Sequence, residues 1–350
     1  MSFTAEELLE NDDQLKTHIQ SRPLMGLTII VGGLILLILL LGLSISVGAA
    51  DIKLSTVWQA VFHYHANLTS DQIIRELRLP RSLASALVGA CFAVAGAMMQ
   101  GMSRNPLADS GLLGLNAGAS FTLAICFAFF PSVSFILLMV YSFCGAGIGA
   151  GLVFGIGSLT RGGLTPVRLT MAGAAVSALL MALSEGIALY FDLSQDLAFW
   201  YAGGVAGTNW LQLKILFPVA GFGLVMAILL SKSITVLSLG EDVATGLGQR
   251  TRIIKIMCSI IVVLLAGSAV SVVGAITFVG LMIPHIARFL VGVDYRWIIP
   301  CSAVLGSLLM VLADIGARMI NPPYETPIGA LISLIGVPFF LYLARKRRRA

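Results

Sequence analysis

Charged residues are scarce in this sequence of 350 residues. Asp, Glu, Lys and Arg together make up 11% of it, whereas about 25% is usual for a soluble domain. Hydrophobic residues make up 58%, and the mean hydropathy is +0.96. This composition excludes an ordinary soluble domain. It predicts an all-α polytopic membrane protein, because helices satisfy their own backbone hydrogen bonds in lipid.

Motifs for nucleotide binding and catalysis are missing as well. No G-x-x-x-x-G-K-[ST] run occurs, so the chain has no phosphate-binding loop of its own and is not an ATPase. It has no H-E-x-x-H, no paired aspartates at helical spacing and no Ser-His pair at membrane depth. We therefore expect no enzymatic activity, no catalytic residue and no resident cofactor.

Metal-binding and disulfide patterns are equally poor. His63 and His65 form an H-x-H, but a third or fourth ligand is missing, so a metal site there is disfavoured. No two cysteines form a C-x-x-C pair, and we expect all five to be small buried hydrophobes without disulfides or a metal cluster. They are Cys91, Cys126, Cys144, Cys258 and Cys301.

Long apolar runs, in contrast, recur along the chain. About twenty apolar residues cross a hydrocarbon core of about 30 Å, and the first such run covers 24–47. Further runs bring the expected number of membrane spans to about ten. They cover 83–102, 111–130, 134–157, 167–190, 211–231, 253–272, 275–291, 297–320 and 327–344. Within the eighth run, we expect Pro284 to end the span.

Basic residues predict the orientation. The formal net charge of +5 comes largely from the tail RKRRR at 345–349, and cytoplasmic segments of membrane proteins carry an excess of Lys and Arg. An even number of spans then puts both termini in the cytoplasm. We expect a cytoplasmic segment over 1–23, a ten-helix transmembrane domain over 24–344 and a basic tail over 345–350. No nucleic acid partner is expected.

Four arginines depart from this charge rule. Arg75, Arg78 and Arg81 are expected on the outer side, and Arg318 is expected to join them from the end of the ninth span. Positive charge held there against the topological bias favours docking of an acidic partner. Contacts with solvent or lipid headgroups are the alternative. Asp314, four residues before Arg318, is expected to form an ion pair with it within the helix.

The longest predicted cytoplasmic segment between spans covers 232–255. Glu241 and Asp242 suit the first turn of a short helix, and Gly246 and Gly248 suit its end. Its apolar face is too small to be buried within its own chain. This favours insertion into a groove of another protein, and a merely structural loop is the alternative.

Glycines and one carboxylate mark the interior of the spans. Gly147, Gly151 and Gly155 recur at every fourth residue, with Gly145 and Gly149 interleaved, which predicts close packing of helices. Glu185 lies within the fifth span, where a charge is costly in hydrocarbon. We expect it to face a polar cavity or a partner, and a structural hydrogen bond to a neighbouring helix is the alternative.

Eight short runs carry a resemblance to a known family, whose order they keep. They are RLPR at 78–81, GAMMQG at 96–101, NPLADSGLLGLNAGA at 105–119, RLTMAG at 168–173, LSLGEDVATGLG at 237–248, FVGLMIPHIAR at 278–288, ADIGAR at 313–318 and ETPIGALISLIGVPFF at 325–340. Over nearly its whole length after residue 24, the sequence resembles FecCD-type permeases, the membrane subunits of ABC importers for iron siderophores, haem and cobalamin.

The resemblance implies a type II ABC importer permease in a bacterial cell membrane. Its implied partners are an ABC ATPase subunit that binds the ATP, an extracellular solute-binding protein and a second permease subunit, as a homodimer or a heterodimer with a paralogue. A ferric siderophore is the expected substrate, with haem and cobalamin left open. A proton-coupled secondary transporter that uses Glu185 and Asp314 as proton carriers is the main rival.

The resemblance also implies roles for individual residues. Those that would dock the solute-binding protein are Arg78, Arg81 and Arg318. Those of a coupling helix that would contact the ATPase are Gly240, Glu241, Ala244, Leu247 and Gly248. Those of an inner gate are Asn105, Leu107, Pro166 and Val167. Glu185 is the candidate for lining the translocation path.

Overall fold

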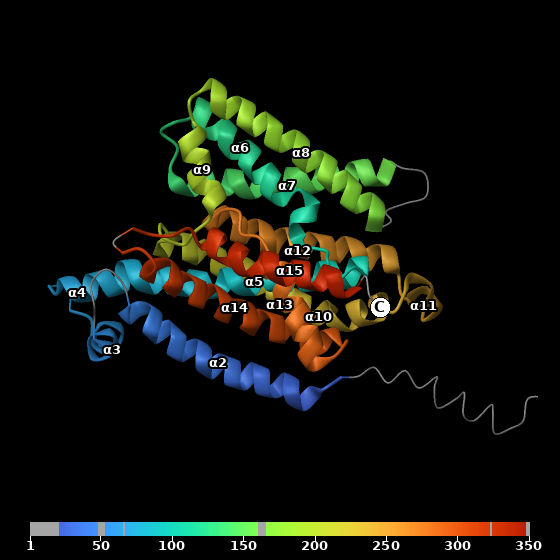
Figure 1. The fold of residues 1–350 in the computed structure, drawn as a ribbon, viewed down its shortest axis with the longest axis horizontal. Helices are drawn as coiled ribbons and strands as arrows, with labels where there is room; N and C mark the ends of the chain where they lie inside the picture. The colour runs from blue at the N-terminus through green and yellow to red at the C-terminus, as the bar shows by residue number, and fades with distance from the viewer. Residues whose placement is uncertain (1–20, 48–52, 66, 160–165, 323, 348–350) are drawn as a thin grey trace, which may run out of the picture.

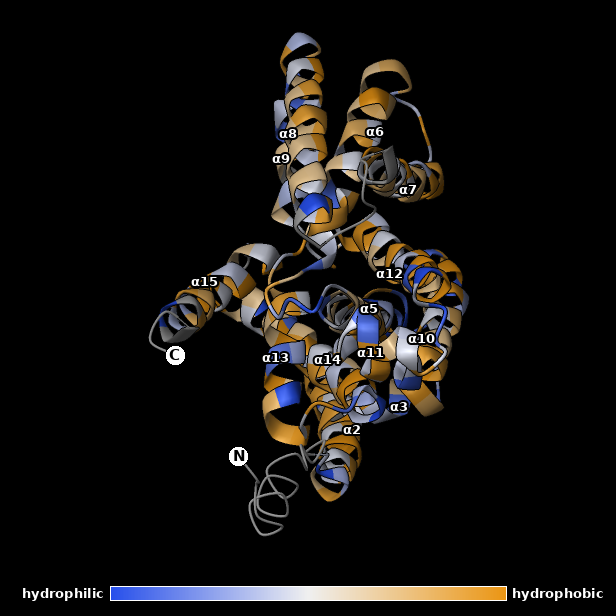
Figure 2. Ribbon diagram, turned by 90° about the vertical axis from the view of Figure 1, so that its right-hand side faces the viewer, coloured by the Kyte–Doolittle hydropathy of each residue, from blue (hydrophilic) through white to orange (hydrophobic). Residues whose placement is uncertain are grey.

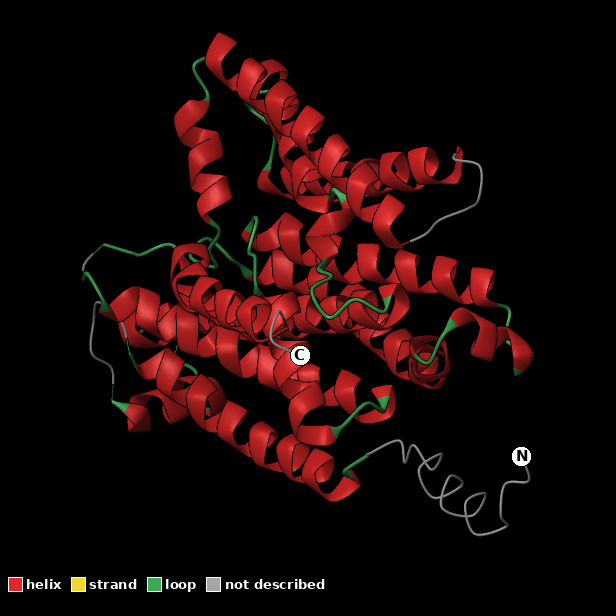
Figure 3. Cartoon of the chain, turned by 45° about the vertical axis from the view of Figure 1, so that its right-hand side comes forward, coloured by secondary structure: helices red, strands yellow, loops and turns green. Residues whose placement is uncertain are grey.

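The protein is a bundle of helices joined by short loops (Figures 1 and 3). A computed structural model describes residues 21–47, 53–65, 67–159, 166–322 and 324–347. The longer helices are α2 (Pro23–Ser46), α5 (Leu79–Ser103), α6 (Leu115–Phe129), α7 (Phe135–Leu159), α8 (Pro166–Tyr190), α10 (Trp210–Ser238), α12 (Thr251–Val273), α13 (Val279–Val291), α14 (Tyr295–Met319) and α15 (Ile328–Arg347). The shorter ones are α3 (Leu54–Phe62), α4 (Thr69–Gln72), η1 (Ile73–Arg78), α9 (Ser194–Ala202), α11 (Glu241–Gly246) and η2 (Ser110–Leu113).

The apolar helices correspond to the predicted spans. In the described part of the chain, seven helices are long and apolar enough to cross a membrane, and three shorter apolar helices accompany them. Figure 2 shows that apolar residues dominate the helices and that polar ones gather mainly toward their ends. The prediction of an all-α polytopic membrane protein is confirmed, with each of the ten predicted runs represented by an apolar helix.

Helix α5 is the central element of the bundle (Figure 2). In the most apolar stretch of Thr69–Ser103, the span that contains α5, 89% of the residues are buried, whereas only 6% are buried in the most apolar stretch of α2. Small residues allow this position. A Cβ on Gly96 would overlap the backbone of Gly280 in α13, and one on Gly89 would overlap the backbone of Gly306 in α14. Backbones that approach this closely increase dispersion contacts, which drive helix association in membranes.

Two helices are shorter than the predicted spans. Helices α6 and α13 have 15 and 13 residues, so they are about 22 and 20 Å long, less than the hydrocarbon core of about 30 Å. The predicted runs 111–130 and 275–291 therefore include backbone that is not α-helical. Leu113 and Ile276, which lie in these stretches, are buried. Such backbone is tolerated at membrane depth because protein covers it.

Helix α13 also continues past its proline. Pro284 was predicted to end the span, but the helix extends to Val291, so that prediction is wrong. Proline has no N–H to donate to the carbonyl four residues earlier, here that of Gly280. Gln100 Nε2 of α5 lies 3.4 Å from this oxygen and 3.1 Å from the Leu281 carbonyl oxygen. The side chain of α5 thus replaces the donor that the proline lacks.

Helices α6 and α7 pack through two of the five glycines that predicted close packing. A Cβ on Gly145 would overlap the Gly118 carbonyl oxygen, and one on Gly149 would overlap that of Gly114. Together with α8 and α9, these helices form a group beside the α5-centred bundle (Figure 1). The interleaved Gly145 and Gly149 therefore make the close contacts.

The other three glycines of this prediction, at positions 147, 151 and 155, face away from the bundle. Nothing described in the structure lies within 4 Å of a Cβ added to Gly147, Gly151 or Gly155. Cys144, which was predicted to be buried, is exposed on the same helix. This face of α7 is therefore available to lipid or to another chain.

Candidate functional site

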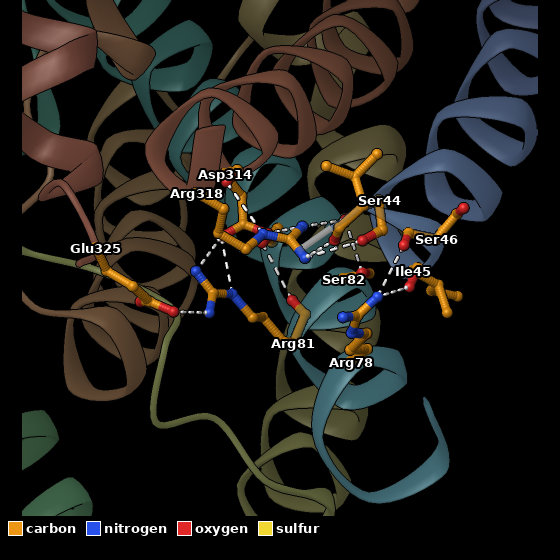
Figure 4. Close-up of polar contacts among 11 residues, drawn as sticks. Ser44, Ile45, Ser46, Arg78, Arg81, Ser82, Asp314, Arg318 and Glu325 are labelled. Carbon is orange, nitrogen blue, oxygen red and sulfur yellow. Dashed lines mark hydrogen bonds and ion pairs between the residues drawn. The ribbon is translucent and has the colours of Figure 1, made fainter. Parts of the chain in front are cut away.

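Two of the arginines predicted at the outer end, Arg81 and Arg318, converge on one buried carboxylate (Figure 4). Asp314 of α14 is fully buried. Its Oδ1 accepts from Arg81 Nε at 2.9 Å and lies 2.8 Å from Arg81 Nη2, while its Oδ2 accepts from Arg318 Nη2 at 2.7 Å. The predicted pair between Asp314 and Arg318 is confirmed. Arg81 of α5 adds a second guanidinium, and charge-assisted bonds of this kind are the strong ones.

Arg318 and Arg78 cap the end of α2. The last carbonyls of a helix have no donor within it, and the guanidinium groups supply donors here. Arg318 Nη1 donates to the Ser44 carbonyl at 2.9 Å, and its Nη2 donates to the Ser44 hydroxyl at 2.6 Å. Arg78 Nη1 donates to the carbonyls of Ile45 and Ser46 at 2.7 and 2.8 Å. Arg78 and Arg318, which were predicted to bind the solute-binding protein, thus hold α2 against α5 and α14.

These arginines are not free surface charges. Arg78 and Arg81 are each 8% exposed, and the Arg318 side chain is 7% exposed. The sequence did not predict this burial or the internal partners of Arg78 and Arg81. Arg75 stays exposed, and its guanidinium carbon lies 4.5 Å from the centre of the Tyr64 ring.

Sequence reasoning missed the carboxylate that completes this cluster. Glu325, in the loop between α14 and α15, accepts from Arg81 Nη1 at 2.5 Å, and its side chain is 43% exposed. The signal was present, because Glu325 opens the ETPIG run that contributed to the resemblance. We call Arg78, Arg81, Asp314, Arg318 and Glu325 the outer cluster.

Helix α10 separates the outer cluster from α11. Trp210, the first residue of α10, donates from Nε1 to the Arg75 carbonyl at 2.7 Å, so this end of α10 lies beside the outer arginines. The helix has 29 residues and is about 43 Å long. Helix α11 follows its other end. The outer cluster and α11 therefore lie at opposite ends of the bundle, as Figure 1 shows for α4 and α11.

The predicted coupling helix is present as α11. The connection that contains it is shorter than 232–255, because α10 continues to Ser238 and α12 begins at Thr251. Glu241 forms an ion pair with Lys255 of α12, which ties the first turn of α11 to the bundle. Ala244 is buried.

The remaining apolar side chains of this helix point away from the chain. Val243 is 47% and Leu247 is 69% exposed. Gly248 adopts φ +78° just after the helix, a conformation that favours glycine at helix ends. A short helix with an exposed apolar face beside acidic residues has the features of a segment that fits a groove on another protein.

The first part of the predicted gate is a hydrogen-bonded turn at the end of α5. Asn105 Oδ1 accepts from the Leu107 amide at 3.0 Å, and the Asn105 carbonyl accepts from the Ala108 amide at 3.0 Å. Arg104 ends α5 in the left-handed region, with φ 52°. Its Nη1 lies 3.8 Å from the position of a Cβ on Gly240, the residue before α11. The turn and the coupling helix are therefore neighbours.

The second part of the predicted gate lies at the start of α8. Pro166 and Val167 form its first turn, but their side chains lie outside the described part of the structure. Further along, a Cβ on Gly173 of α8 would overlap the Leu112 carbonyl oxygen of η2. The segment that follows the Asn105 turn thus packs against α8.

Glu185 lies on an exposed face of α8. The expected alternative, a hydrogen bond to a neighbouring helix, is not formed among the residues that the structure describes. Ala178, Ala182 and Gly186 are exposed as well and recur at every fourth position of this helix. A carboxylate beside small residues on an open helix face is consistent with a polar path or a second chain.

Taken together, the apolar helices, with the outer cluster at one end of the bundle and α11 at the other, define a polytopic membrane protein with polar features at both ends. The FecCD transport family matches residues 35–346, and the chain belongs to this family. The resemblance stated from the eight sequence runs is confirmed.

Individual relatives agree with this assignment. The iron(3+)-hydroxamate import system permease protein FhuB of Bacillus subtilis is 57% identical over 329 residues, which are 94% of this chain and 86% of the relative. The iron-uptake system permease protein FeuB of the same organism is 45% identical over 305 residues, covering 87% and 91%. A metal-chelate type ABC transporter, solved in an inward-facing conformation, matches with a TM-score of 0.79 at 28% identity and covers 91% of this chain and 99% of that one. The chain is an ABC importer permease.

Proposed function

We propose that this permease imports ferric siderophores of the hydroxamate class. The observation that supports this substrate is the 57% identity to a relative named for iron(3+)-hydroxamate import. Relatives named for iron(3+)-citrate, ferric enterobactin and hemin are 42%, 41% and 33% identical. The iron chelate is cargo, so the chain needs no resident metal.

In the proposed assembly, this permease contacts three kinds of partner subunit. An extracellular solute-binding protein docks at the outer cluster, an ABC ATPase receives α11, and a second permease subunit completes the path. ATP binding and hydrolysis take place on the ATPase. The opposite placement of the outer cluster and α11 supports this arrangement, because cargo and energy then arrive on different sides of the membrane.

The proposed transport step is alternating access without covalent chemistry in this chain. Closure of the ATPase moves α11, and the ion pair between Glu241 and Lys255 passes the motion to α12. Arg104, beside Gly240, passes it to the turn of Asn105 and Leu107. This turn and the start of α8 at 166–167 would form the inner gate.

The exposed face of α8 suits the second permease subunit and the path between the two. Burying a carboxylate against lipid is costly, so Glu185 is better placed in a water-filled path. Ala178, Ala182 and Gly186 would allow close approach of a second helix beside it. We propose that both termini lie with α11 in the cytoplasm of a bacterial cell.

Reconstitution tests this function. Proteoliposomes that contain the permease, its ATPase and the solute-binding protein should accumulate a ferric trihydroxamate only with ATP, and excess ferric citrate or hemin should compete poorly. The rival proton-coupled transporter predicts uptake by the permease alone on a proton gradient. Such uptake, with no dependence on ATP, would contradict the proposed function.

A further inference from the structure

Two arginines of the outer cluster, Arg318 and Arg81, already donate to partners inside the protein. An arginine has five N–H donors. Those of Arg318 are matched by the Asp314 carbonyl and carboxylate, the Ser44 carbonyl and hydroxyl and the Val47 carbonyl, at 2.6 to 3.3 Å. Arg318 therefore has no donor left for an external carboxylate without breaking a contact inside the protein.

The guanidinium group of Arg81 pairs with two carboxylates, one buried and one open to solvent. Its Nε and Nη2 face Asp314, which is fully buried and shared with Arg318. The bond from Nη1 goes to Glu325, whose side chain is 43% exposed. Among these contacts, the pair of Arg81 Nη1 with Glu325 is the one that solvent, and hence a partner, reaches.

The loop around Glu325 permits the exchange. The backbone next to it is anchored, because the Thr326 amide donates to the Ala317 carbonyl of α14 at 3.1 Å. Rotation of the Glu325 side chain alone would free Nη1, without moving α14 or α15. The Glu325 side chain is 43% exposed, so solvent weakens this ion pair and it exchanges more readily than the buried pair of Arg81 with Asp314.

We infer that Glu325 is an internal competitor for docking: it occupies the edge of Arg81 that an acidic side chain of the docking partner takes over. The inference rests on the proposed function. Glu325 also reduces the attraction on approach, because the outer cluster has three positive and two negative side chains with it and three and one without it. The docking surface is thus partly self-neutralised until a partner carboxylate displaces Glu325.

Binding measurements on the full permease–ATPase complex in nanodiscs test this inference. The probe is the solute-binding protein that supports ATP-driven uptake by the wild type. Glu325→Gln should tighten its binding by up to about fivefold, mainly through a faster association rate at low salt. Glu325→Asp, which keeps the charge on a shorter side chain, should give an intermediate affinity. Thermal unfolding of both variants checks that they are folded.

Asp196→Asn is the matched control, since it removes an exposed carboxylate at the start of α9 and should leave the affinity unchanged. Binding by Glu325→Gln that is equal to or weaker than that of wild type overturns the inference, because Glu325 then only positions Arg81. In that case the importer function still stands, as shown by ATP-driven uptake. If no solute-binding protein binds the wild type, both the function and the inference fail.

Discussion

At the scale of single residues, Asp314 has the largest expected effect on stability. It is fully buried and accepts bonds from two arginines, so Asp314→Asn would leave two buried cations with a neutral partner. Removing one member of a buried ionic group costs about 3–5 kcal/mol. The unfolding temperature of the variant in detergent should fall markedly, whereas Asp242→Asn, at an exposed position, should leave it unchanged. Equal effects of the two changes would contradict the importance of the buried cluster.

Residues of the outer cluster were predictable only in part. Arg81 and Arg318 stood out because basic residues are unusual on the outer side. Their burial was not predictable from sequence, since the partners of Arg81 lie 233 and 244 residues away in the chain. Pairing over such separations depends on how the helices pack, and local patterns carry no information about it.

At the scale of helices, glycine positions give a direct test of packing. Gly96→Ala should destabilise the protein by about 1–3 kcal/mol or prevent its folding, because the added Cβ would overlap the Gly280 backbone. Gly151→Ala should leave stability unchanged or slightly raised, because its Cβ would meet nothing described within 4 Å. Folded yield and thermal unfolding in detergent measure both. A Gly151→Ala loss as large as that of Gly96→Ala would mean that the outward face of α7 is packed in the assembly.

A second pair of glycines tests the coupling helix. Gly240 has φ +136°, which L side chains rarely adopt, whereas Gly246 lies within α11 with open space around it. Gly240→Ala should strain the start of α11 by about 1–3 kcal/mol and lower the uptake obtained per ATP hydrolysed. Gly246→Ala should preserve this ratio. An unchanged ratio in Gly240→Ala would show that the geometry of this junction is not needed for coupling.

Helix positions followed from the sequence more closely than helix ends did. Each predicted span corresponds to an apolar helix, because a run of about twenty apolar residues matches the thickness of the hydrocarbon core and is rare in soluble segments. The predicted runs were longer than α6 and α13, because hydropathy does not separate residues of the α-helix from apolar residues that flank it, such as Leu113 and Ile276. Five glycines of α7 predicted close packing, but which of them pack on α6 was not predictable, because one helix alone does not reveal which of its faces meets a neighbour.

At the scale of the whole molecule, the proposed function depends on three separated surfaces. The outer cluster, α11 and the exposed face of α8 each lack part of the machinery that import requires, and each is proposed to receive a different subunit. The bundle around α5 connects them, because α5 carries Arg81 in its first turn, packs on α10, α12, α13 and α14, and ends at the turn beside Gly240. In the proposed transport step, this buried helix links the two ends.

This arrangement requires the outer cluster and α11 to lie on opposite sides of the membrane, which cysteine labelling tests. Tyr324 and Leu247 are 73% and 69% exposed, and they flank Glu325 and α11 respectively. In a background with Cys144→Ser, a membrane-impermeant maleimide should label Tyr324→Cys in intact spheroplasts. It should label Leu247→Cys only after permeabilisation. Labelling of both positions from the same side would rule out a chain that receives cargo at one surface and is driven by an ATPase at the other.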